Sequence, residues 1–224
     1  MRHYIFTIIF IFGSLIGLGQ GTAVNAGTND AAYAKTIHQR AEKIISAMAI
    51  TDSAKAARVT EIVSSQYLTL NNIQTDKENK IKAAKAQNAD NKETLAAQVK
   101  VHEEVASQSV QKQHGIFITA LSKELTPSQV DQVKDGMTYN VVNITYKGYL
   151  EEVPELKETE KKQIMAWLVE AREHAIDAES AEKKHAWFGK YKGRINNYLS
   201  AAGYDLKKLG EEWQKRIKAA AAEK

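Results

Sequence analysis

Residues 180–203 carry the side chains whose types and spacing are best suited to binding a ligand. In a helix, residues three and four apart share one side, and one such stripe combines a large aromatic ring with cations and an amide: Lys183, Trp187, Lys190, Arg194 and Asn197. An indole can stack on a sugar ring, while ammonium, guanidinium and amide groups can bind hydroxyl or carboxylate oxygens. The ligand-binding surface that we expect is made by Trp187, Lys190, Arg194, Asn196, Asn197 and His185.

Two glycines lie on the same side of this predicted helix. Gly189 and Gly193 are four residues apart, next to His185 and Asn196. A glycine inside a helix costs about 1 kcal/mol relative to alanine, so the pair predicts a close approach to the helix backbone, by a neighbouring helix or by a ligand. The alternative for the aromatic stripe is that Trp187 packs beneath the tyrosine-rich residues 137–153 and the cations are only solvated.

Metal and catalytic chemistry have weaker candidates. Glu170, His174 and Asp177 can share a helix face, but zinc needs convergent ligands, and the alternative is an exposed helix with salt bridges. Three further histidines, His38, His102 and His114, are scattered along the sequence and are expected at helix interfaces. Adjacent acidic residues, such as those at 103–104, 151–152 and 211–212, point about 100° apart on a helix and fit surface charge better than an acid and base pair. No nucleophile elbow or phosphate-binding glycine loop occurs. We expect no catalytic residue, metal or cofactor, and therefore no enzyme.

The first residues predict export. Arg2 and His3 precede an apolar run from Tyr4 to Leu18 and then small residues, which is typical of a signal peptide. We expect residues 1–26 to be removed by cleavage. The alternative is that they remain as an uncleaved membrane anchor. The sequence has no cysteine and a formal charge of +4, so no disulfide or lipid anchor is expected, nor is nucleic-acid binding. We therefore expect a periplasmic or secreted protein that is not stably inserted in a membrane.

Residues 27–224 are expected to form a single all-α domain. Helical periodicity runs from residue 57 to 87 and returns through residue 121, with apolar residues thinning toward Asn88 from both sides. That pattern predicts an irregular helical bundle with a protruding antiparallel hairpin, its arm covering roughly residues 70–100. Thr126 and Pro127 begin another helix. Residues 137–153 lack a helical period and are expected to cross the bundle, partly extended.

Two segments, LTPSQVDQVKDGMTYNVVNITYKGYLEEVPEL and KKHAWFGKYKGRINNYLSAAGYDLKK, give the chain a resemblance to a family. Together with the export signal, they resemble a family of uncharacterised secreted helical proteins of Bacteroidetes, a domain of unknown function. The resemblance implies a periplasmic or secreted helical protein associated with polysaccharide use and brings no catalytic residues. Leu125, Thr126 and Gln129 are also similar to the Leu-Thr-x-x-Gln repeat of small periplasmic chaperones, but at Leu156 the threonine and glutamine are replaced.

Two functions are therefore compared. The first is a non-enzymatic exported binding or accessory protein whose ligand is a glycan or a sugar acid. The second is a chaperone-like protein that shelters unfolded clients on an apolar concave surface, which would make other proteins its partners.

Overall fold

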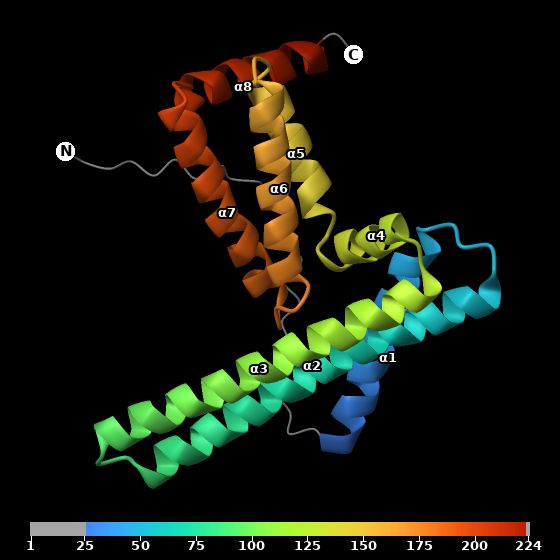
Figure 1. The fold of residues 1–224 in the computed structure, drawn as a ribbon, viewed down its shortest axis with the longest axis vertical. Helices are drawn as coiled ribbons and strands as arrows, with labels where there is room; N and C mark the ends of the chain where they lie inside the picture. The colour runs from blue at the N-terminus through green and yellow to red at the C-terminus, as the bar shows by residue number, and fades with distance from the viewer. Residues whose placement is uncertain (1–25, 223–224) are drawn as a thin grey trace.

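The computed structural model describes residues 26–222, with side chains from residue 31 onward. The predicted signal peptide lies almost wholly outside this range. The described part is all α-helical, as the sequence predicts, and Figure 1 shows its eight helices. They are α1 (Ala26–Ser46), α2 (Ser53–Gln87), α3 (Lys92–Glu124), α4 (Pro127–Met137), α5 (Val141–Glu152), α6 (Glu158–Ala175), α7 (Ala181–Ala201) and α8 (Leu206–Ala222). No helix among these residues is long and apolar enough to cross a bilayer.

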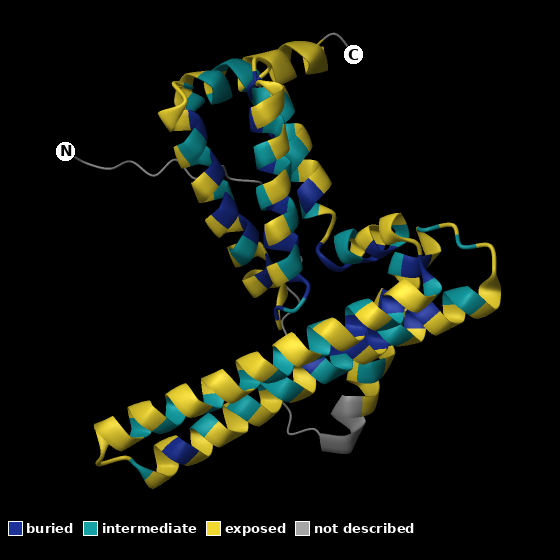
Figure 2. Ribbon diagram, in the orientation of Figure 1, coloured by how far each residue is buried: buried dark blue, intermediate teal, exposed yellow. Residues whose placement is uncertain are grey.

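The antiparallel pair α2 and α3 confirms the protruding hairpin (Figure 1). Local capping sets its ends: Asp52 accepts a hydrogen bond from the Lys55 backbone N–H, and Asn91 accepts one from the Thr94 backbone N–H. Beyond Leu70, α2 has one buried residue, Ala84, and α3 has none before Phe117. The tip of the hairpin is therefore mostly exposed, as Figure 2 shows, and its two helices lie against each other.

The base of the hairpin belongs to a first hydrophobic core built from α1 to α4. Its fully enclosed residues include Ile37, Val59, Val63, Phe117, Leu121 and Val133. One residue from the turn after α6, Ile176, also packs into this core. Gly136 lets α4 approach α1 closely, because a Cβ at this position would lie 2.6 Å from Cγ2 of Ile44.

The expectation for residues 137–153 is wrong, because Val141–Glu152 form helix α5. A sharp turn precedes it, in which Tyr139 and Asn140 have φ values of 58° and 56°. The period is obscured because α5 buries Val142 and Tyr149 but leaves Ile144 52% exposed. An apolar residue on the solvent side removes the contrast from which a helical face is recognised.

A second core joins α5 to α8 and has Ile164, Leu168, Phe188, Ile195 and Leu199 at its centre. Helix α7 ends at Ala201, and Gly203, two residues further on, takes the left-handed conformation that glycine tolerates, with a φ of 99°. Asp205 then accepts a hydrogen bond from the Lys208 backbone N–H at the start of α8. Helix α8 lies across the ends of the preceding helices and has no buried residue (Figures 1 and 2).

Candidate functional site

A groove of about 940 Å³ separates the middle of the hairpin from the lower ends of α6 and α7. Helices α2 and α3 form one wall, with Leu70, Ile73 and Val110 among its apolar residues. The other wall comes from the end of α6, the turn after it and the first half of α7, including Trp187. The two walls therefore come from helices of the two different cores. The contacts that join the cores also set the width of the groove.

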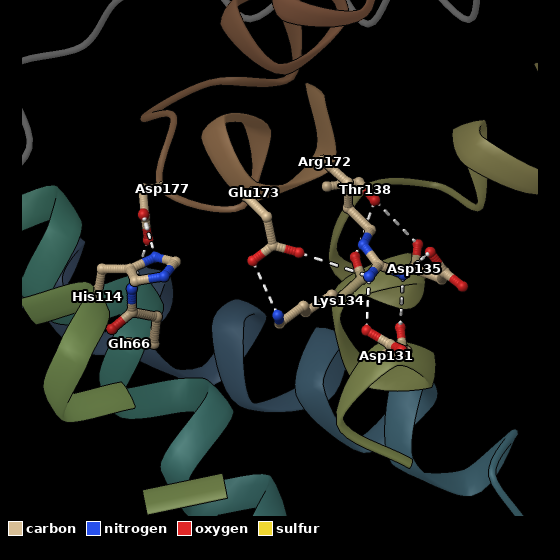
Figure 3. Close-up of polar contacts among 9 residues, drawn as sticks. All are labelled: Gln66, His114, Asp131, Lys134, Asp135, Thr138, Arg172, Glu173 and Asp177. Carbon is tan, nitrogen blue, oxygen red and sulfur yellow. Dashed lines mark hydrogen bonds and ion pairs between the residues drawn. The ribbon is translucent and has the colours of Figure 1, made fainter. Parts of the chain in front are cut away.

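A buried polar chain joins the hairpin to the turn after α6 (Figure 3). Nδ1 of His114 lies 2.6 Å from Oδ2 of Asp177, and Nε2 of Gln66 donates to Oδ1 at 3.0 Å. Gln113 in turn donates to Oε1 of Gln66 at 2.9 Å. Burial raises the pKa of Asp177, and His114, Lys184 and Gln66 oppose that rise by favouring the carboxylate.

Lys184 is a buried cation beside this chain. It is 4% exposed, and its ammonium donates to the carbonyl oxygens of Ala175 at 2.9 Å and Ile176 at 3.1 Å. These are terminal carbonyls of α6, which carry no intrahelical partner and attract positive charge. Burial lowers the pKa of Lys184 to about 8, although Asp177 acts in the opposite direction. Lys184 thus satisfies carbonyl oxygens at the C-terminal end of α6.

A second polar bridge joins α6 to α4, as Figure 3 also shows. The Arg172 guanidinium contacts Asp135 at 2.7 Å and Asp131 at 2.5 Å, and Lys134 pairs with Glu173 at 2.8 Å. The Arg172 side chain is only 5% exposed. These ion pairs, together with the His114 and Asp177 contact, hold the second core on the first.

The structure divides the predicted binding surface. Trp187 and Lys190 line the groove. The Trp187 ring stacks on His174 with centroids 4.3 Å apart, and Nζ of Lys190 lies 5.0 Å from the indole centroid. Trp187 therefore packs on α6, with part of its ring still exposed to the groove.

The other predicted residues do not line the groove. Arg194 lies over Trp167 at 4.5 Å and beside Glu170 at 3.6 Å. Asn196 accepts a hydrogen bond of 2.7 Å from the Tyr149 hydroxyl, and the His185 ring stacks on Tyr139 with centroids 5.5 Å apart. Asn197 is exposed. Arg194, Asn196 and His185 therefore have protein partners outside the groove.

The close approach to Gly189 and Gly193 by a neighbouring helix does not occur. Both residues are exposed, and a Cβ at either would meet no atom of the described chain within 4 Å. The glycines are therefore not packing positions, and contact with a ligand stays a prediction.

The residues considered for zinc are also drawn to separate partners. Glu170 accepts from the Tyr191 hydroxyl at 2.7 Å, His174 stacks on Trp187, and Asp177 binds His114. Across residues 26–222, no three histidine, aspartate or glutamate side chains are placed to share a metal ion.

The sequence interpretation missed the residues that connect the groove walls. His114 was assigned to a helix interface, which is correct, but its partner Asp177 is 63 positions away. Gln66 is 111 positions from the same carboxylate. No spacing pattern links residues at such separations, because their meeting depends on how the two cores are placed.

Comparison with known proteins places the chain in a family without assigning it an activity. No curated protein matches it. A family model described as a protein of unknown function, DUF3826, matches residues 34–219. This range holds nearly all of the described helices, including both walls of the groove. The chain therefore belongs to the DUF3826 family.

Proposed function

We propose that this protein is an exported, non-enzymatic binding protein that takes a carbohydrate into the groove between the hairpin and α7. The observation that carries the proposal is the composition of the groove. The partly exposed Trp187 ring lies there among apolar side chains and among polar groups that can hydrogen-bond, such as the Lys190 ammonium and the His114 imidazole. A sugar presents the matching combination of apolar ring face and peripheral hydroxyls, and pockets of this size commonly hold small ligands.

The location in the periplasm or outside the cell is part of the same proposal. It is supported by the basic start and apolar run of residues 2–18. Mass spectrometry of the protein recovered from its native cells tests this, with a mature chain beginning between Gln20 and Gly27 as the expected result. An intact Met1 on membrane-bound protein would contradict it.

Binding is tested by titrating the purified protein with neutral and acidic oligosaccharides in a calorimeter. Trp187→Ala should weaken binding at least about tenfold, because an anchoring aromatic ring contributes on the order of 1.5 kcal/mol or more. Trp213→Ala is the matched control, since Trp213 lies on α8 and does not line the groove. Equal loss of affinity in both variants, or no binding by the unaltered protein, would reject the proposal.

A chaperone-like function has one observation in its favour. Val101 and Val105 are four residues apart on α3 and are 54% and 49% exposed, and Ile116 is 52% exposed. Apolar residues on a projecting hairpin could contact an unfolded client. Suppressed aggregation of a chemically denatured enzyme, lost in a Val101→Ser and Val105→Ser double variant, would favour this alternative. Unchanged aggregation would dismiss it.

A further inference from the structure

The two ring nitrogens of His114 have different surroundings. Nδ1 is held by Asp177, whereas Nε2 has no hydrogen-bond partner among the described residues. The His114 side chain is 31% exposed and lines the groove. A polar atom left without a protein partner at the wall of a groove is available to a ligand.

Asp177 fixes which nitrogen carries the proton. A carboxylate only accepts hydrogen bonds, and here it receives one from Gln66 on Oδ1 and one from His114 on Oδ2. The Gln66 amide is itself oriented, because Gln113 donates to its oxygen. The proton of neutral His114 is thus held on Nδ1, so Nε2 can only accept a hydrogen bond.

The chemistry of Nε2 indicates what should donate that bond. Charge does not decide the ligand, because the carboxylates of the groove have cationic neighbours: Glu173 pairs with Lys134 at 2.8 Å and Glu179 with Lys183 at 3.9 Å, and Lys184 interacts with Asp177. At neutral pH a carboxylate has no proton to give to Nε2, whereas a hydroxyl has one.

We infer that Nε2 of His114 accepts a hydrogen bond from a ligand hydroxyl and that Asp177 is its positioning residue. This inference rests on the proposed carbohydrate binding and names the contact that orients the saccharide in the groove.

Two substitutions separate the role of Nε2 from that of Asp177. In His114→Asn, the amide nitrogen can take the place of Nδ1 and still donate to Asp177, but nothing replaces Nε2. In Asp177→Asn, the carboxamide can donate to Nδ1, which moves the histidine proton to Nε2 and converts the acceptor into a donor. His102→Asn is the control, because His102 also lies on α3 but does not line this groove.

The probes are oligomers of glucose, galactose and mannose and the matching uronic acid oligomers, titrated by calorimetry near pH 7.5. His114→Asn and Asp177→Asn should each weaken neutral binding about fivefold, the value of one hydrogen bond of about 1 kcal/mol. The His102→Asn control should bind as the unaltered protein does.

Nitrogen NMR of the histidine rings tests the tautomer without any ligand. Nε2 of His114 should lack a proton in the unaltered protein and carry one in Asp177→Asn. A proton on Nε2 in the unaltered protein would overturn the inference, and so would unchanged neutral binding in His114→Asn. Either result leaves carbohydrate binding intact. Absence of binding to every oligomer would instead reject the proposed function and the inference together.

Discussion

The buried Lys184 predicts an unusual dependence of stability on pH. Its pKa is lowered to about 8 in the folded protein from the ordinary value of 10.5. Between these values the unfolded chain binds more protons at this residue than the folded chain does. The free energy of unfolding must therefore rise with pH through this window, because the cost of burying the charged ammonium disappears as the folded state loses its proton.

The size of the effect follows from the two pKa values. Proton linkage at this one group gives a gain of about 1.5 kcal/mol in unfolding free energy between pH 8 and pH 9.5. The upper limit is set by the buried tyrosines. Burial raises the pKa of Tyr67 and Tyr149, so only the unfolded chain loses these protons above about pH 10, and stability then falls again.

Urea unfolding at pH 8, 8.5, 9 and 9.5, followed by circular dichroism, measures this gain. Lys184→Met is the matched variant, because methionine is a flexible apolar side chain that carries no charge. It should be less stable overall, since the Ile176 carbonyl loses the Lys184 donor and the Ala175 carbonyl keeps only the Ala178 N–H. Its unfolding free energy should also stay level across these pH values. An equal rise in both proteins would refute the assignment to Lys184.

Three further predictions concern stability. Arg172→Met should lower the free energy of unfolding by about 3 kcal/mol in urea, because it leaves Asp131 and Asp135 without their cation; a loss no greater than that of Lys161→Met, at an exposed ion pair, would contradict this. Gly193→Ala should raise the melting temperature through a gain of about 0.5–1 kcal/mol, since no atom lies within 4 Å of the new Cβ, whereas Gly136→Ala should lower it by collision with Ile44. Replacing residues 80–99 by a short turn should keep the helical circular dichroism and cooperative unfolding, as only Ala84 is buried there; loss of cooperativity would show that the tip supports a core.

Local signals mark several helix ends of this fold. Thr126 and Pro127 begin α4 with a capping box, and the left-handed Gly203 follows the end of α7. Such features depend on side chains within a few residues of each other, so they can be read from the sequence alone. Helix α5 could not be found in this way, because Ile144 stays exposed while Tyr149 is buried.

The candidate site was predictable only in part. Trp187 and Lys190 were found because one helix carries both and both face the groove. Arg194 was misplaced, since its neighbours Trp167 and Glu170 come from α6 and satisfy its charge outside the groove. His114 and Asp177 were found only with the structure, because their contact depends on the placement of one core on the other.

The two cores have a consequence for the order in which the molecule is assembled. Apart from Ile176, each core is built from one continuous stretch of chain, the first ending in α4 and the second beginning in α5. Each can collect its own contacts during folding without waiting for the other. The groove has no such independence, because one wall comes from each core. The groove is therefore complete only when both cores have formed. A ligand that binds in the groove would bind the fully folded molecule and not either half by itself.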